Sequence, residues 1–122
     1  MRQYLEAMRS GDREAAFGHY AEDIVGHVPG RSSRAGELRG KDAVVGYIRA
    51  VVAHASEGVE VDLIDMLASE ERVALIVRER LRRDGRTLDM RRVNVYRVEG
   101  EKIVEIRIFE ADQYAVDEFL EG

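Results

Sequence analysis

The apolar positions of the first part of the chain follow a helical period. They recur at spacings of three and four from Tyr4 to Phe17, and a Ser-Gly-Asp break interrupts them at residues 10–12. We therefore expect two helices, over residues 2–9 and 12–20, with an aspartate able to cap the start of the second.

A short strand and a loop follow these helices. Residues 23–28 alternate around β-branched side chains and predict a strand that ends at Pro29. The polar segment 31–39 predicts a flexible loop, which we interpret as a mobile gate over a pocket. The next apolar stripe predicts a helix over residues 41–55, with Asp42 in its first turn.

From Val59 onward the period changes to two, which is typical of half-buried strands. Asp84-Gly85 is a strong signal for a tight hairpin, and a second turn is expected at residues 99–101. The tail from Ala111 predicts a short helix or a closing segment. The predicted strands cover residues 59–67, 72–83, 87–98 and 102–109. Helices followed by a run of antiparallel strands predict an α+β fold, a curved sheet with helices on one face.

The Asp84-Gly85 turn also predicts which side chains share a face of the sheet. It places Glu79 opposite Met90, and Leu81 opposite Leu88. The predicted inner face carries Val73, Leu75, Val77, Glu79, Leu88, Met90, Arg92, Asn94 and Tyr96. The predicted outer face carries Ala74, Ile76, Arg78, Arg80, Arg82, Asp89, Arg91, Val93, Val95 and Arg97.

The length of the second turn leaves the register of the last strand open. A longer turn points Val104, Ile106 and Ile108 inward. A turn one residue shorter points Ile103, Glu105, Arg107 and Phe109 inward. We favour the longer, three-residue turn because it keeps the charged side chains at 105 and 107 out of the interior.

Composition sets bounds on the function. The chain has 122 residues, a formal net charge of −5 and no cysteine. We expect a single domain over residues 1–122, without disulfides and without a basic face for nucleic acid. No apolar run is long enough to cross a bilayer, and the N-terminus is unlike a signal peptide, so we expect a cytoplasmic protein with no membrane partner.

An arginine on the inward face is the most informative feature, because a buried charge is costly unless it is paired. Arg92 has two interpretations: an ion pair with Glu79, or a ligand contact made together with Asn94 in a half-solvated cavity. His27, expected to be the last inward residue of its strand, is either a core residue or an acid–base catalyst. His19 and His54 lack metal-ligand spacing, so we expect no metal and no cofactor.

Three segments of the chain carry a resemblance to a known family. FGHYAEDIVGHVPG, ELRGKDAVVGYI and VNVYRVEGEKIVEIRIFEADQY resemble the nuclear transport factor two-like superfamily, and more narrowly its SnoaL-like proteins. The resemblance implies a cone-shaped, strongly curved antiparallel sheet wrapped around N-terminal helices. It also implies an apolar pocket with a few polar groups, and often a homodimer. The superfamily holds isomerases, cyclases, hydrolases and binding modules, so the fold alone does not fix the function.

The limonene epoxide hydrolases of this superfamily offer a comparison of site residues. Their strand motif of arginine, one residue and an acid resembles Arg92-Val93-Asn94, and their water-holding asparagine falls at His27. Their second acid falls at about Ile108, as does an acid of the SnoaL-like cyclases. This chain therefore has an amide and an aliphatic side chain where the hydrolases have carboxylates.

These observations leave several hypotheses about function. In the first, the chain is a cofactor-independent isomerase, cyclase, lyase or hydrolase in which His27 removes a proton beside a carbonyl group and Arg92 and Asn94 stabilise the enolate. In the others, it is a non-catalytic module for a small apolar ligand, or a homodimer formed through the outer sheet face. Further candidates for the pocket lining are Glu79, Tyr47, Met90, Ile108, Asp112 and Tyr114.

Overall fold

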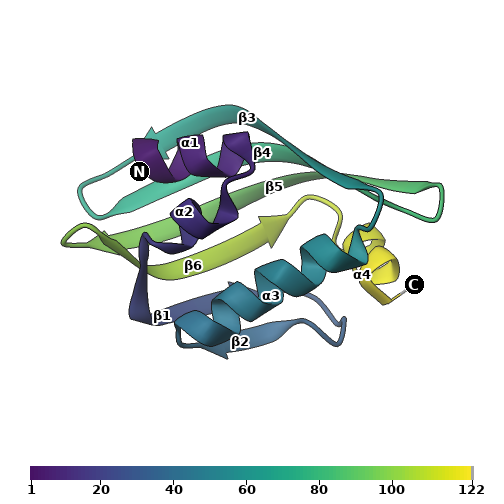
Figure 1. Ribbon diagram of the computed structural model, residues 1–122, viewed down its shortest axis with the longest axis horizontal. Helices are drawn as coiled ribbons and strands as arrows, with labels where there is room; N and C mark the ends of the chain where they lie inside the picture. The colour runs from purple at the N-terminus through teal and green to yellow at the C-terminus, as the bar shows by residue number, and fades with distance from the viewer. Residues whose placement is uncertain (122) are drawn as a thin grey trace.

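A computed structural model describes residues 1–121 and contains four helices and one sheet of six strands (Figure 1). The helices are α1 (Arg2–Ser10), α2 (Arg13–Phe17), α3 (Lys41–His54) and α4 (Gln113–Glu121). The strands are β1 (Tyr20–Val28), β2 (Gly36–Arg39), β3 (Gly58–Ala68), β4 (Arg72–Arg83), β5 (Arg86–Glu99) and β6 (Lys102–Glu110). The α+β fold expected from the sequence is confirmed.

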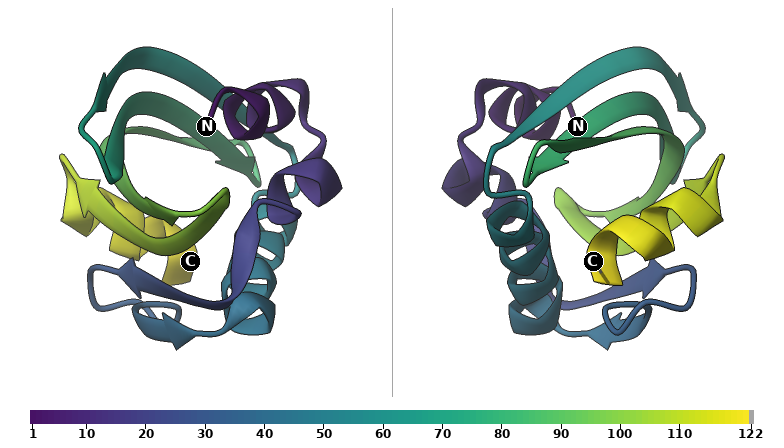
Figure 2. Two further views of the ribbon diagram at one scale, coloured as in Figure 1. Left: turned by 90° about the vertical axis from the view of Figure 1, so that its left-hand side faces the viewer. Right: turned by 90° about the vertical axis from the view of Figure 1, so that its right-hand side faces the viewer.

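The sheet has the strand order β2-β1-β6-β5-β4-β3 and curls around the helices (Figure 2). Neighbouring strands are antiparallel except β1 and β6, which run parallel. Helices α1, α2 and α3 lie on the concave side, and their apolar side chains pack in one core with the inner faces of β1, β4, β5 and β6. No helix within residues 1–121 is long and apolar enough to span a membrane.

The N-terminal helices form where the sequence predicts them, but the second is shorter than expected. Asp12 caps α2, its Oδ1 accepting a hydrogen bond from the Ala15 amide at 3.2 Å. The helix ends at Phe17 because Tyr20 already belongs to β1. The Tyr20 hydroxyl lies 2.9 Å from the hydroxyl of Tyr4 in α1, and this buried contact ties helix and sheet together.

The predicted register of the central hairpin is confirmed. Glu79 lies opposite Met90, and Leu81 opposite Leu88. The preferred length of the second turn is wrong: only Gly100 and Glu101 separate β5 from β6, and Glu99 pairs with Lys102. A bulge then corrects the register.

The bulge lies in β6, where Val98 pairs with Ile103 but Arg97 pairs with Glu105. The extra residue, Val104, changes the parity of the strand. As a result Ile103 is buried at the start of the strand, and Ile106 and Ile108 face inward beyond the bulge, as we expected. Val104, which we expected to face inward with them, is half-buried at the bulge and is not among the residues packed in the core.

The segment 31–39 is not a gate. Its second half is β2, which pairs with β1, and its first half is attached to α4. The Arg31 amide donates to Asp117 Oδ2 at 3.1 Å, and Gln113 Nε2 donates to the Pro29 carbonyl at 3.4 Å. The sequence did not reveal β2 because its four residues are mostly polar.

Candidate functional site

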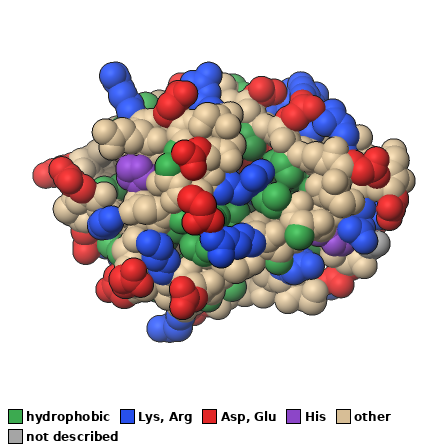
Figure 3. Space-filling model, viewed as in Figure 1, with side chains coloured by type: hydrophobic (Ala, Val, Ile, Leu, Met, Phe, Trp, Pro, Cys, Tyr) green, Lys and Arg blue, Asp and Glu red, His purple; other side chains and the backbone are tan. Residues whose placement is uncertain are grey.

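A cavity of about 520 Å³ opens between α1, α3 and the inner face of the sheet. Its volume is within the range typical of small-molecule sites. The space-filling view shows apolar side chains in a hollow on this face, with acidic and basic side chains at its edge (Figure 3). The apolar part of the wall consists of Met8, Ile48, Val51, Val52, Val59, Val61, Leu81, Ile106 and Ile108.

A chain of three charges forms one side of the cavity. Arg92 donates from Nε to Glu110 Oε1 at 3.0 Å and from Nη2 to Glu110 Oε2, and its Nη1 donates to Glu79 Oε2 at 3.2 Å. Burial disfavours the charged guanidinium, but the two carboxylates outweigh it and raise the pKa of Arg92 above its ordinary value. Arg92 is therefore a permanent cation. The ion pair with Glu79 expected from the sequence is present, and Arg92 also lines the cavity, where its contact with a ligand stays a prediction.

Of the two carboxylates that hold Arg92, Glu79 is the one that lines the cavity. It lines the wall together with Arg92, whereas the side chain of Glu110 is only 2% exposed. Arg92 contacts Oε2 of Glu79, and no hydrogen bond to Oε1 from the residues that the structure describes is found. Glu110 binds the guanidinium through Nε and Nη2, whereas Glu79 binds Nη1.

Four tyrosines add hydroxyl groups to the wall. Tyr4, Tyr20 and Tyr96 form a cluster, with the rings of Tyr4 and Tyr96 centred 5.4 Å apart. Burial raises the pKa of each of these three phenols above its ordinary value, and it also raises the pKa of Tyr47 in α3. All four stay neutral at physiological pH. Either Tyr4 or Tyr20 donates its proton to the other, so the donors that remain for a ligand oxygen come from the other hydroxyls.

Asn94 lies on the wall between the charge chain and the tyrosine cluster. It pairs with Ile108 across β5 and β6, so both side chains face the interior. Its Oδ1 is buried without a hydrogen-bond partner. A buried amide oxygen of this kind is costly to leave unpaired, which is characteristic of a site that a ligand or a water completes.

His27 lies outside this cavity, which corrects the expectation that it meets Arg92 and Asn94. In β1, Gly26 faces α3: a Cβ built on it lies 3.4 Å from Val44 Cγ2. His27, the next residue, therefore points to the other side of the sheet. There its Nε2 lies 3.1 Å from Glu105 Oε2 and 3.3 Å from Arg107 Nη2.

Three other residues expected in the pocket also lie elsewhere. Met90 is buried against α4 in a second apolar cluster. Asp112 caps α4, its Oδ1 accepting from the Ala115 amide at 3.1 Å, and Tyr114 is 90% exposed. Neither residue is part of the cavity lining.

Glu110 is the residue of this site that sequence reasoning missed. It ends β6 and pairs directly with Arg92. The sequence does contain a signal for it. Alternate residues of a strand share a face, so if Ile106 and Ile108 point inward, Glu110 does too, next to the strand that carries Arg92. Within residues 1–121, no three histidine, aspartate or glutamate side chains form a cluster that could hold a metal ion.

Comparison with known proteins agrees with this architecture. The model of the SnoaL-like domain matches residues 1–106. An uncharacterized protein of Mycobacterium tuberculosis is 32% identical over 120 residues, which cover 98% of this chain and 92% of that protein.

Solved structures show the same fold. A Xanthomonas campestris protein of unknown function with a cystatin-like fold superposes with a TM-score of 0.90 at 28% identity, covering 99% of this chain and 95% of that one. An NTF2-like protein from Burkholderia xenovorans superposes with a TM-score of 0.72 at 27% identity, covering 98% of this chain and 91% of that one. The chain belongs to the SnoaL-like family and has the fold of NTF2-like proteins.

Proposed function

We propose that the cavity binds a small, mostly apolar molecule that carries a carbonyl or hydroxyl group, and that the protein moves a proton on it. The support is the composition of the wall: aliphatic side chains for the body of the ligand, and hydroxyl, amide and carboxylate groups on its inner side. The single observation that carries the proposal is Glu79, a carboxylate that lines an apolar cavity and is oriented by Arg92.

In this proposal Glu79 takes the role that the sequence suggested for His27. Its Oε1 removes a proton from the carbon next to a carbonyl group, and the neutral Tyr96 hydroxyl and the Asn94 amide stabilise the enolate oxygen. The reaction class is a cofactor-independent isomerisation or cyclisation. Proton return from Glu79 to another position completes it, so the protein is regenerated without a further reactant.

Deuterium exchange tests proton abstraction without knowledge of the natural substrate. The protein is incubated with 2-tetralone, an enolisable bicyclic ketone, in D₂O, and loss of the α-proton signal is followed by NMR. We expect exchange faster than in buffer, and a decrease of about 100-fold or more in Glu79→Gln. Glu105→Gln, on the outer face, is the control and retains the rate. Exchange no faster than in buffer refutes the catalytic role of Glu79.

The second candidate is a non-catalytic binding module. The ion pairs of Arg92 with Glu79 and Glu110 favour it. Arg92 contacts both Glu79 and Glu110, and the contact with Glu79 Oε2 holds that carboxylate in an ion pair instead of leaving it free for a substrate proton. This candidate predicts that ketones such as 2-tetralone bind, with chemical-shift changes for Ile48 and Ile108, but that no exchange occurs. One NMR sample therefore distinguishes the two candidates: chemical-shift changes report binding, and loss of the α-proton signal reports catalysis.

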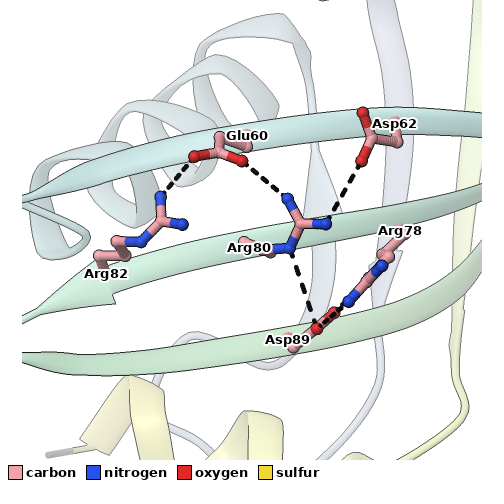
Figure 4. Close-up of polar contacts among 6 residues, drawn as sticks. All are labelled: Glu60, Asp62, Arg78, Arg80, Arg82 and Asp89. Atoms are coloured by element: carbon pink, nitrogen blue, oxygen red, sulfur yellow. Dashed lines mark hydrogen bonds and ion pairs between the residues drawn. The ribbon is translucent and has the colours of Figure 1, made fainter.

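We also infer that the outer face of the sheet forms a homodimer. It carries an apolar patch of Leu67, Ala74, Ile76, Val93, Val95 and Phe109, whose members pair across β3 to β6. Beside the patch lies a network of three arginines and three carboxylates (Figure 4). Leu67 and Phe109 are 56% and 52% exposed, which is unusual for such large apolar residues. A face with both charge signs and an apolar centre can pair with its own copy about a twofold axis.

Sedimentation velocity tests the dimer. We expect a dimer at micromolar concentration, and a monomer for Phe109→Glu. Tyr114→Glu is the control, because it adds the same charge at an exposed position of α4, away from this face. A monomeric wild-type protein contradicts the inference.

A further inference from the structure

Charged residues of opposite sign belong to the two sides of the cavity mouth. Arg9 and Arg13 line it from the end of α1 and the start of α2. Glu60 and Asp62 belong to β3, across the opening, but they pair with Arg80 and Arg78, so their side chains lie on the outer face of the sheet. Which sign a ligand meets depends on which of these charges are already paired.

The acidic side is neutralised by neighbouring arginines. Glu60 accepts hydrogen bonds from Arg80 at 2.8 Å and from Arg82 at 2.6 Å, and Asp62 lies 3.7 Å from Arg80 (Figure 4). These carboxylates therefore contribute little negative potential at the mouth.

The basic side is not neutralised. Neither Arg9 nor Arg13 forms a salt bridge with any residue that the structure describes. Two uncompensated guanidinium groups thus lie at the opening, although the chain as a whole carries a formal charge of −5. Guanidinium groups bind carboxylate and phosphate oxygens with good geometry.

The interior, by contrast, does not attract an anion. Its only buried guanidinium among the wall residues, Arg92, is held by two carboxylates, so the group of three carries a net negative charge. An anionic ligand group is therefore repelled from the inner end of the cavity and attracted to its mouth. This difference predicts the orientation of a bound ligand, with its anionic group at the mouth.

We propose that the ligand is amphipathic, with an apolar body in the cavity and an anionic group, a carboxylate or a phosphate ester, held at the mouth by Arg9 and Arg13. This inference rests on the proposed function, since it names the class of molecule that the cavity takes. The apolar body places its reacting carbon next to Glu79, while the anion sets how far the molecule enters.

Matched naphthalenes test the proposal. The chain has no tryptophan, so naphthalene fluorescence reports binding without that background. We compare 2-naphthylacetic acid, its methyl ester and 2-naphthyl phosphate, each titrated with the protein at low and high NaCl. We expect the anions to bind about tenfold more tightly than the ester at low salt, and the advantage to shrink as salt screens it. The stronger of the two anions identifies the head group.

Two double variants with equal charge change complete the test. Arg9→Gln/Arg13→Gln removes the preference for the anions and leaves ester binding unchanged. Arg2→Gln/Arg72→Gln, at exposed positions outside the cavity, keeps the preference. If the ester binds as tightly as the acid, or if the preference survives loss of Arg9 and Arg13, the inference is overturned while the proposed pocket stands. If none of the three compounds binds, the proposed function fails and this inference fails with it.

Discussion

Glu110 grips Arg92 through both carboxylate oxygens from the directly paired position on the neighbouring strand, 18 residues away in the sequence. Glu79, on the opposite neighbour of β5, holds the remaining side of the guanidinium. Three adjacent strands thus each contribute one charge to a chain that lies along the cavity wall. The geometry fixes the guanidinium in place and leaves Glu79 in contact with the ligand space.

Removal of Arg92 is expected to destabilise the protein strongly. Arg92→Ala leaves two largely buried carboxylates without a counterion, and loss of one partner of a buried pair costs about 3–5 kcal/mol. Urea unfolding measures the loss. Arg97→Ala, on the outer face, is the control with an expected cost below about 1 kcal/mol. An equal decrease in the free energy of unfolding in the two variants would contradict a special contribution of the buried ion pairs to stability.

The buried tyrosines predict a loss of stability at alkaline pH. Burial raises the pKa of Tyr4, Tyr20 and Tyr96 above the ordinary value of 10.0, so above pH 10 these phenols release protons when the chain unfolds. The folded state then binds more protons than the unfolded state, and stability falls by about 1.4 kcal/mol per pH unit for each such phenol. The pH dependence of the free energy of unfolding for Tyr96→Phe should be shallower by about one such increment. A slope identical to that of the wild type would argue against it.

Gly30 is expected to be essential for the attachment of the 29–34 segment to α4. It has a φ of +102°, and a Cβ at this position collides with the side chains of Asp117 and Gln113. Gly30→Ala should therefore cost about 1–3 kcal/mol and speed amide exchange at Arg31. Gly100→Ala is the matched control: its φ is +60°, but nothing lies within 4 Å of the added carbon. If the control loses as much, backbone strain and not the contact with α4 explains the effect.

The outer network should make the protein sensitive to acid. Hydrogen bonds from Arg82 and Arg80 lower the pKa of Glu60 below its ordinary value of 4.5, and Arg78 lowers the pKa of Asp89 below 3.8. Lowered folded-state values mean that the stabilisation is present above these ordinary values and is lost as the pH falls through the folded ones. The urea midpoint, followed downward from pH 5, should fall less steeply in Glu60→Gln/Asp89→Asn than in the wild type. Parallel curves would contradict this.

The sequence predicted the parts of the fold that local chemistry determines. The Asp84-Gly85 turn needs positive φ at both positions, so it set the β4–β5 register and with it the sides on which Arg92, Asn94 and Tyr96 lie. The final register of β6 also follows from local chemistry, because charged side chains at 105 and 107 do not belong inside.

What the sequence could not predict depends on contacts between distant segments. The side that His27 faces is set by the close packing of Gly26 on α3, and no local pattern contains that contact. The pairing of Glu110 with Arg92 needs the register of two strands, which a bulge changes by one residue. The 31–39 segment looks flexible from its composition, yet side chains of α4 hold it in place.

The bulge at Val104 also bears on how the chain tolerates changes of length. Because β6 holds one residue more than the ladder needs, Ile103 and Ile106 both reach the core although they lie three positions apart. Deletion of Val104 would force a choice between burying Ile103 and keeping Ile108 and Glu110 on the cavity side. An insertion in the turn at Gly100 leaves both halves of the strand as they are, so engineering that adds residues should begin there.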